Sequence, residues 1–595
     1  MWNTAANWSG SNRPDTTAET AAFGTAASNR RSLTFSANTN FSIAGISFNS
    51  GANAFTVTLN SSSSLTLAGA GIADTSGNTS AQSLVSHGTL TFSNSASAGD
   101  AKVTVSTSAN TSNAFVTTNF NDSSSAGTAI LSVTGSASNA FGQVLFNNTS
   151  TAASSTISVS GSNGGNGDLE FHNSSTAASS QITIGDQGQI NFYDGSTAGS
   201  ATVSANTDFA LLNFDGTASA GSAHFTTSSN VAFNGSSTAG SSTWQMNASD
   251  FSEISFNANS TAGSATIALD FSAIGFSDAS TAGSATIALT NASSVSFSGT
   301  ANGGTANFDV SSDSTMDFSL TTAPTLTVGS ITGSGQVYLG ANQLQIGGTN
   351  ASFTFSGQFF DGGGLTKVGT CTLTLSGNNQ YTGPTNLNAG KLILTGSVAS
   401  SSLTTVNSGA TLAGYGHVGS LTVASGGTLA PGATTYSYDT LRAGNTTLYG
   451  GGTFQWQIDN SHVPFARWDQ LAVTGALDLT NLFNGSGGRF NLSLQSLTFS
   501  DVPGPLAVFD PTANYSFTFL TTTGGITGFA ANKFAIDTTG FQNPFTGTWS
   551  VSSDGFNLSL DYTAPAIAPV PEPGTTAACI AALALGAAVI LRRRR

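Results

Sequence analysis

Carboxylates are the most frequent side chains in this sequence that could do acid–base chemistry, and a few lie close enough together to work in pairs. Asp168 lies two residues before Glu170, and Asp250 lies three residues before Glu253. Two carboxyl groups can hydrolyse a glycosidic bond, one acting as acid and the other as base or nucleophile. Such pairs are also common on ordinary protein surfaces. The sequence therefore allows two interpretations of each pair, a hydrolytic site or solvated surface acids.

Three further aspartates, Asp194, Asp215 and Asp278, follow a Phe at similar places in a repeated pattern. If the repeats stack, these side chains could form a carboxylate row that binds cations. Aspartate is also a frequent turn residue, because its side chain hydrogen-bonds to nearby backbone and tolerates unusual dihedral angles. Turn formation is the simpler of the two hypotheses.

Other reactive groups are too scattered to predict a catalytic, cofactor-binding or metal-binding site. The sequence lacks metal-ligand spacings of His and Cys, a G-x-S-x-G elbow and a phosphate-binding loop. We therefore predict that the chain is not an enzyme and needs no cofactor or metal. The remaining candidate ligands, all isolated, are His87, His172, His224, His417, His462, Cys371 and Cys579.

The charge distribution excludes nucleic acid as a partner. The formal net charge is −15, and neither Lys nor Arg occurs between Lys102 and Lys367. Nucleic-acid binding requires basic side chains that neutralise phosphates. Only 7% of residues are charged, yet 38% are hydrophobic and 40 are Phe, which favours a folded chain over a disordered one.

Internal repeats are the strongest structural signal. The string STAGSATIAL occurs at 260–269 and again at 280–289, and looser copies bring the total to ten, spaced 19 to 28 residues apart. Apolar residues alternate within each copy, as in a β-strand, and Gly, Ser, Asn and Asp separate the apolar runs. A unit of about 20 residues cannot bury its own core, so neighbouring units must stack. We predict an all-β fold, a long parallel β-helix in which the repeated Phe residues fill the interior rather than bind sugars.

A change of pattern begins near residue 361. The matching stretches are Gly364-Leu365-Thr366-Lys367, Thr372–Gly377, Asn379, Tyr381-Thr382-Gly383 and Ala389-Gly390. This region resembles the autotransporter-associated β-strand repeat, also called the passenger-associated transport repeat, with Cys371 at a position where that family usually has Gly. The resemblance implies a β-helical surface or secreted passenger and no particular activity.

Composition and pattern divide the chain into five predicted regions. Residues 1–85 form an N-terminal β cap and first coils, in which Trp2, Trp8 and Phe23 would close the end of the rod. Residues 86–360 form the repeated β-helix, and 361–440 the autotransporter-type repeat region. Residues 441–562 read as longer, antiparallel strands that form a C-terminal cap. Residues 563–595 comprise a Pro/Ala-rich linker and a C-terminal tail.

The tail combines a short motif, an apolar stretch and a basic end. Val570, Pro571, Glu572 and Pro573 precede the uncharged stretch Thr575 to Leu591, which as a helix spans about 25 Å, and the chain ends in four arginines, Arg592, Arg593, Arg594 and Arg595. We predict a single C-terminal transmembrane helix with the arginines on the cytoplasmic side. The tail resembles the PEP-CTERM sorting signal. That resemblance implies export in a Gram-negative-type bacterium and processing by the membrane protease exosortase.

The sequence thus predicts an exported structural or adhesive β-helix protein of the cell surface or extracellular matrix. It would be anchored transiently in the inner membrane, with exosortase as a partner and extracellular polysaccharide as a further candidate partner. One alternative is a carbohydrate-binding or carbohydrate-cleaving β-helix protein, and another is a tail-anchored cytosolic protein. Because export requires an N-terminal signal peptide and Met1 opens on folded-looking sequence, we expect the natural start to lie upstream.

Overall fold

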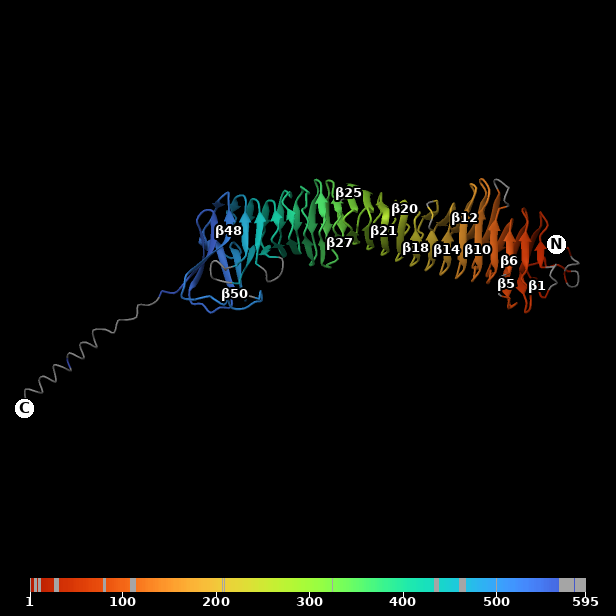
Figure 1. Ribbon diagram of the computed structural model, residues 1–595, viewed down its shortest axis with the longest axis horizontal. Coiled ribbons are helices and arrows are strands. Elements are labelled where there is room, and N and C mark those ends of the chain that lie inside the picture. Colours follow the sequence, from red (N-terminus) through yellow and green to blue (C-terminus); the bar gives the residue numbers. More distant parts are fainter. Residues whose placement is uncertain are drawn as a thin grey trace, which may run out of the picture.

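The computed structural model shows one long rod of stacked β-coils, with the N-terminus at one end and the last strands at the other (Figure 1). It describes residues 2–566 except 5–7, 9–11, 26–30, 79–81, 108–113, 206, 208, 324, 433–437, 460–466 and 499, and beyond these Leu583 alone. At 248–251 only the backbone is described. The predicted all-β parallel solenoid is confirmed.

Each coil contributes to three columns of parallel strand pairing that run along the rod. Parallel pairing satisfies every coil's backbone groups on its two neighbours, and side chains alternate between the interior and the solvent. The first column is continuous over almost the whole rod. Its strands are β2 (Ser32–Thr34), β4 (Thr56–Leu59), β6 (Ser83–Ser86), β8 (Lys102–Ser106), β10 (Ile130–Gly135), β12 (Thr156–Gly161), β14 (Gln181–Ile184), β16 (Thr202–Ala205), β18 (His224–Thr227), the first parts of β20 (Thr243–Phe256) and β21 (Thr266–Phe276), β22 (Thr286–Thr290), β24 (Asn307–Val310), β27 (Ser330–Gly333), β30 (Phe353–Phe355), β33 (Thr372–Leu375), β35 (Gly390–Leu394), β38 (Ala410–Gly414), β41 (Thr428–Pro431), β44 (Thr453–Ile458), β47 (Phe490–Ser496) and β50 (Phe534–Gly540).

The second column carries the candidate site described below. It uses the first parts of β3 (Asn40–Phe48) and β5 (Ser64–Asp74), then β7 (Thr89–Phe92), β9 (Phe115–Phe120), β11 (Phe141–Phe146), β13 (Asn166–Phe171), β15 (Gly188–Phe192), β17 (Leu211–Phe214), β19 (Asn230–Phe233), the second parts of β20 and β21, β23 (Ser294–Gly299), β25 (Thr315–Thr321), β28 (Gln336–Tyr338) and β31 (Gln358–Phe360). It continues through a bridge between Asn378 and Ser397. Its remaining strands are β36 (Ser397–Val398), β39 (His417–Val418), β42 (Thr440–Ala443), β45 (Gln470–Val473), β48 (Tyr515–Thr522), β52 (Asn557–Thr563) and β51 (Thr548–Ser553).

The third column changes width along the rod. It begins with β1 (Thr20–Phe23) and the second parts of β3 and β5, and then narrows to one bridging residue per coil. Those single bridges join the opening residues of the ten sequence repeats, from Ser97 to Asn302. From residue 326 the column widens again, into β26 (Leu326–Val328), β29 (Gln343–Ile346), β32 (Gly364–Lys367), β34 (Thr385–Leu387), β37 (Thr404–Val406), β40 (Leu421–Val423), β43 (Thr446–Leu448), β46 (Leu477–Asp478) and β49 (Ile526–Thr527), and a short 3-10 turn, η4 (Ala531–Lys533), precedes β50.

The repeated Phe residues form one stack inside the rod, as predicted. Successive rings lie 4.6 to 4.9 Å apart and nearly parallel from Phe92 to Phe318. All of these side chains are buried. The spacing equals the distance between hydrogen-bonded strands, so each coil adds one ring to the column. This Phe column, together with rows of Ile, Val, Leu and Ala, forms the core.

Both ends of the rod are closed by aromatic clusters. At the N-terminal end Trp2 is fully buried, stacks on Phe35 at 4.7 Å and contacts Trp8 at 4.8 Å, and Trp8 also contacts Phe23. Trp2, Trp8 and Phe23, which the sequence suggested for this end, thus contact one another there.

The C-terminal end differs from the prediction. β42, β45 and β47 still pair in parallel with the coils before them, so the expectation of antiparallel strands throughout 441–562 is wrong. Among the named strands of the described residues, antiparallel pairing involves only the last ones, where β52 lies between β48 and β51, and elsewhere it is limited to isolated bridges such as Ile458 with Trp468. Long alternating strands are compatible with either direction, and the connections between them, which determine the direction, carry weak turn signals.

The predicted tail, Val570 to Arg595, lies outside the described residues except for Leu583. Among the residues that the structure describes, no helix has the length and apolar character needed to cross a membrane.

Candidate functional site: an acidic and aromatic surface on the second column

The candidate site is the outward surface of four consecutive strands of the second column, β9, β11, β13 and β15. In-register pairing places Gln143 beside Asp168, and Asp168 beside Gln189. Residues at i and i+2 of a strand share a face about 7 Å apart, so Asp168 and Glu170 both point outward while Leu169 and Phe171 enter the core. The pair singled out in the sequence is therefore brought together on one surface.

Glu170 is the centre of a hydrogen-bond network. One carboxylate oxygen accepts a bond from Nε2 of Gln143 at 3.2 Å, and the other lies 2.9 Å from Nε2 of His172. The His172 ring in turn stacks on the Tyr193 ring of the next coil, with centroids 4.8 Å apart. Glu170 is thereby held in one orientation, and the two stacked rings form a flat wall beside it.

Asp168 is in a very different environment. It is only 8% exposed, and its Oδ1 atom has no hydrogen-bond partner among the described residues. Burial, followed by repulsion from Glu170, raises the pKa of Asp168 to about 6. Burial, followed by the charges of Glu170, Asp215 and Asp168, also raises the pKa of Tyr193. The site thus contains a carboxyl group that can exchange a proton near neutral pH and lacks a hydrogen-bond partner at one oxygen.

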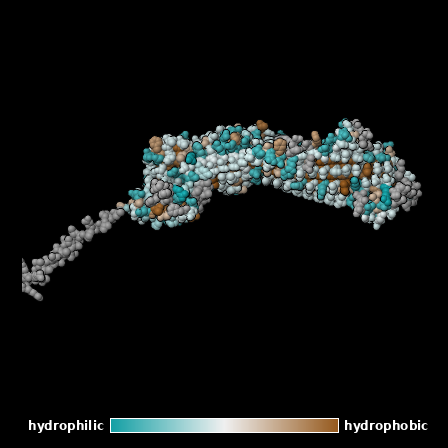
Figure 2. Space-filling model, in the orientation of Figure 1, coloured by the Kyte–Doolittle hydropathy of each residue, from teal (hydrophilic) through white to brown (hydrophobic). Residues whose placement is uncertain are grey.

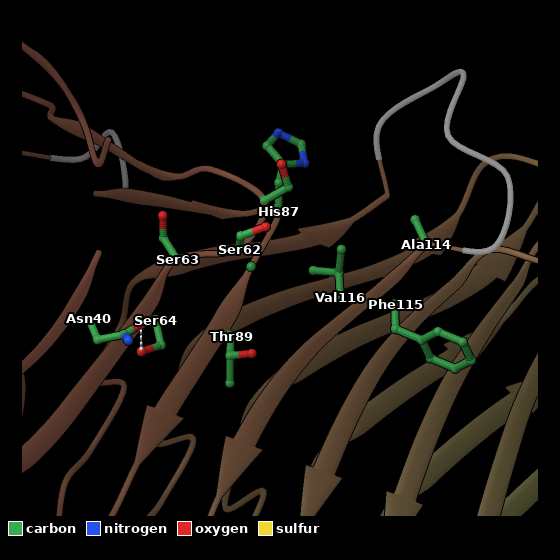
Figure 3. A pocket seen from close by; sticks show the side chains of 11 residues that line it. Asn40, Ser62, Ser63, Ser64, His87, Thr89, Ala114, Phe115 and Val116 are labelled. Atoms are coloured by element: carbon green, nitrogen blue, oxygen red, sulfur yellow. Dashed lines mark hydrogen bonds between the residues drawn. The ribbon is translucent and has the colours of Figure 1, made fainter. Parts of the chain in front are cut away.

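A second aromatic pair borders the site. Phe115 is 69% exposed, and its ring stacks on that of Phe141 at 5.0 Å. Phe115 also borders a hollow of about 460 Å³ in the preceding coils, which Asn40, Ser64, His87 and Thr89 line with polar groups. Figure 3 shows the Phe115 ring standing clear of its strand at one side of this hollow, and the hydrogen bond of 2.7 Å between Ser64 and Asn40 at the other.

Much of the remaining surface is weakly polar, because it carries Ser, Thr, Asn and Gly. Figure 2 shows mostly pale and teal surface, with hydrophobic side chains gathered over the N-terminal third of the rod. Large exposed apolar residues of this third include Phe115 and Ile130. The site therefore lies in the part of the rod where exposed apolar side chains gather.

The predicted aspartate row consists of turn residues. Asp194 and Asp278 have positive φ angles of 56° and 57°, and each accepts a backbone N–H bond from the preceding coil, at 2.9 and 3.0 Å. Asp215 accepts a bond from the side chain of Asn234 at 2.8 Å. Within the described part of the chain no three His, Cys, Asp or Glu side chains are grouped so that they could hold a metal ion.

The other predicted candidates do not join the site. The side chain of Asp250 lies outside the described residues, so the pair with Glu253 stays a prediction. His462 and Cys579 also lie outside them. His224 belongs to β18 of the first column, and His417 belongs to β39 near the far end. Cys371 is buried and free.

Phe115, Phe141 and the stack of His172 on Tyr193 were not predicted as site residues. A signal for the first two was present, because Phe115 and Phe141 lie five residues before the column residues Phe120 and Phe146. An odd separation along a strand puts two side chains on opposite faces. The stacking of His172 on Tyr193 depends on which coil residues come into register, and loops of variable length conceal that register in the sequence.

Comparison with known proteins supports the repeat interpretation. Residues 365–394 match the family model described as Passenger-associated-transport-repeat, which confirms the resemblance found in the sequence. These residues begin within β32 and end with β35. The match covers too little of the chain to assign the whole protein to that family.

Two curated proteins are similar over short parts of their length. The Adhesin BmaC autotransporter of Brucella suis biovar 1 (strain 1330) is 40% identical over 113 residues, which are 19% of this chain and 3% of the adhesin. The Extracellular serine protease of Serratia marcescens is 36% identical over 169 residues, 28% of this chain and 14% of the protease. The chain thus spans a small fraction of either relative.

Among solved structures, the Haemophilus influenzae Hap adhesin aligns with 89% of this chain and 64% of its own, at 13% identity and a TM-score of 0.26. That TM-score is too low to establish a common fold.

Proposed function

We propose that this protein is an exported, non-enzymatic rod of the cell surface or extracellular matrix that acts in adhesion. The observation that carries the proposal is the continuous three-column coil, whose third column is bridged by the sequence repeats themselves. A solenoid of this kind presents a long surface with many similar positions, which suits attachment better than catalysis at one point. The matched transport repeat and the similarity to a stretch of an adhesin support the same function.

The hydrogen bonding of Glu170 supports a role other than catalysis. Gln143 and His172 hydrogen-bond its two oxygens, so its carboxylate is already engaged within the protein. Cleavage of a carbohydrate is the alternative activity, with Asp168 as acid and Glu170 as base. Release of reducing ends from polysaccharides incubated with the purified protein would favour that alternative.

Carbohydrate binding without cleavage is the second candidate function. The exposed stack of Phe115 on Phe141, next to outward carboxylates, is the specific observation in its favour. This function is compatible with adhesion, since a surface rod can attach through a glycan.

For the route of export we propose the sorting signal suggested by the tail, with exosortase as the processing partner. Val570–Pro573 would be the recognition motif, 575–591 the transient inner-membrane helix and Arg592–Arg595 the cytoplasmic stop. Transient anchoring of this kind is compatible with a rod that works outside the cell.

Fractionation of producing cells, followed by mass mapping of the mature C-terminus, tests the route. We expect surface or secreted protein that has lost Arg592–Arg595. A stable surface protein that still carries the four arginines would contradict the sorting proposal, and a rod protected from protease in intact cells would contradict export.

Adhesion is tested by display of the full chain on cells that lack it. We expect displaying cells to attach to a matrix or to one another more than cells that display a rod of unrelated sequence. Equal attachment by both would overturn the adhesive function.

A further inference from the structure

We propose that the outward surface of β9, β11, β13 and β15 binds a neutral, hydroxyl-rich glycan chain, with Phe115, Phe141, Asp168 and Tyr193 as its contacts. The inference rests on the proposed adhesive function and names the ligand class and the place of attachment. It depends on four properties of this surface: aromatic rings, an unpaired buried acceptor, the absence of bases and the available length.

Aromatic rings provide the apolar part of the contact. Phe115 and Phe141 form an outward stack, and Tyr193 and His172 form a second one further along the same face. Exposing a Phe ring to water is unfavourable relative to burying it, so a ligand that covers Phe115 is stabilised by removing that ring from water. The C–H face of a sugar ring is an apolar, flat surface of a size that can cover such a ring, and the Tyr193 hydroxyl adds a polar group at the edge.

The polar part of the contact comes from Asp168. The Asp168 side chain belongs to the outward face of β13, and its Oδ1 atom is buried and lacks a donor among the described residues. Leaving a buried acceptor unpaired is unfavourable, and a ligand hydroxyl that displaces the side chains covering this atom would supply the missing donor. Glu170 differs from Asp168, because Gln143 and His172 already hydrogen-bond its two oxygens.

The charge of the surroundings selects among ligands. Between Lys102 and Lys367 the chain has no Lys or Arg that could pair with an acidic polysaccharide, His172 already contacts Glu170, and the carboxylates would repel an acidic chain. A basic peptide would need several unpaired acids, whereas Asp168 is the one carboxylate of this cluster not engaged by a side chain of the described residues. A neutral sugar chain needs hydroxyl acceptors and apolar faces, and the surface offers both.

The available length suits a polymer rather than a single sugar. The hollow beside His87, the Phe pair, Asp168 and Tyr193 belong to successive coils. At about 4.8 Å per coil, the surface extends roughly 20 Å along the rod, and the strands add width across it. A glycan chain of several residues would therefore lie along the rod axis.

The test measures binding by the full-length chain in mild detergent, with soluble neutral β-glucan and chitin oligosaccharides as probes and polygalacturonate as the acidic comparison. We expect neutral probes to bind and the double variant Phe115→Ser/Phe141→Ser and the variant Asp168→Ala each to weaken binding at least tenfold. Phe209→Ser is the matched control, since Phe209 is 74% exposed and belongs to no stack in the described structure, and it should bind as the unaltered chain does. A circular dichroism spectrum and a melting temperature like those of the unaltered chain would show that each variant folds.

Several results would overturn the proposal. They are absence of binding to every neutral probe, unchanged binding by both site variants, tighter binding of polygalacturonate or of a polylysine peptide, and release of reducing ends. Adhesion of cells that display the chain is measured in parallel. If Phe115→Ser/Phe141→Ser cells still adhere fully, this site is wrong and the adhesive function stands. If cells with the unaltered chain fail to adhere, the adhesive function itself fails.

Discussion

Two ionisable residues, Asp168 and Lys367, are buried in this rod in opposite ways. Asp168 faces outward with one oxygen unpaired, whereas Lys367 lies inside and donates to three backbone carbonyls, of Val368, Gly369 and Ala389, at 2.7, 3.0 and 3.3 Å. The first arrangement is unfavourable for the folded state, whereas the second stabilises a turn. We therefore expect substitutions of the two residues to affect stability differently.

Asp168 should make the rod less stable as the pH rises. Its pKa is about 6 in the folded chain and 3.8 ordinarily, so the folded state holds the proton more tightly. The stability that this group contributes is complete below about pH 4 and is lost as the pH rises through about 6. We expect Asp168→Asn to be more stable than the unaltered chain by about 3 kcal/mol at pH 7.5 and equally stable at pH 3.5.

Hydrogen exchange of the β13 amides at the two pH values measures this effect, because local opening reports the coil that contains Asp168. The exposed residue Asp122 is the control, and Asp122→Asn should show no such pH-dependent gain. If the stability difference between Asp168→Asn and the unaltered chain were the same at both pH values, the raised pKa of Asp168 would not be its cause.

Lys367 should contribute strongly to the stability of the coil that contains it. Lys367→Met keeps the length and apolar stem but leaves three carbonyls without their donor, at an expected loss of about 3 kcal/mol. Urea unfolding, or exchange of the β32 and β34 amides, would show the loss. Lys102→Met, at an exposed lysine, should change stability by less than about 0.5 kcal/mol. Equal effects of both substitutions would show that the three hydrogen bonds contribute little.

At the scale of the strand and coil, the Phe column is a continuous part of the buried core. Phe192 is fully buried, between Phe171 and Phe214, at 4.8 Å from each. Phe192→Ala would leave a cavity in the middle of the column and should reduce stability by about 3 to 5 kcal/mol. Phe271→Ala, at a 44% exposed ring, is the comparison and should have a small effect.

Because each coil contacts mainly its neighbours, the loss from Phe192→Ala should be local. Amide exchange should accelerate in β15 and in the adjacent β13 and β17, and remain unchanged in β41. Acceleration along the whole rod would instead indicate one cooperative unit.

Some glycines at the turns beside the third column, such as Gly240, tolerate few other residues, and the reason differs from that for the Phe column. Gly240 has a φ of +61°, and a Cβ atom there would lie 2.5 Å from the Gly221 carbonyl oxygen of the previous coil. Gly240→Ala should therefore reduce stability by roughly 1 to 3 kcal/mol. Gly77→Ala has open space for its Cβ atom and a similar φ of +67°, so it separates backbone strain from the steric clash. Equal losses in thermal unfolding would show that strain alone matters.

Much of the coil was predictable, and the reasons are physical. Alternation of apolar and polar residues, turn residues and the repeat period identify the strands, the stacking and the Phe column, because successive coils have similar local structure. The direction of the strands after residue 441 and the contacts among Asp168, Glu170, His172 and Tyr193 were harder to predict. Both depend on which residues come into register across coils of unequal length, and one residue of slip changes every contact.

For the whole molecule, the antiparallel hairpin of β51 and β52 closes the second column. Removing residues 541–566 together with the tail would leave β48 without β52 and would expose its edge. Unpaired edges pair with other chains, so we expect concentration-dependent assembly in light scattering. A chain ended after residue 566 keeps every described strand and is the control. A chain ended at 540 that remained monomeric would show that the edge is protected in another way.

The same stacking of coils has a mechanical consequence. The backbone hydrogen bonds between coils run along the rod, so a pull on its two ends loads them one coil at a time. A coil of about 20 residues occupies about 4.8 Å of rod but releases roughly 70 Å of chain when it peels away. Under tension the rod would lengthen in repeated steps and dissipate work at each one. If the rod attaches cells as proposed, it would extend under load and absorb energy rather than transmit the full force at once.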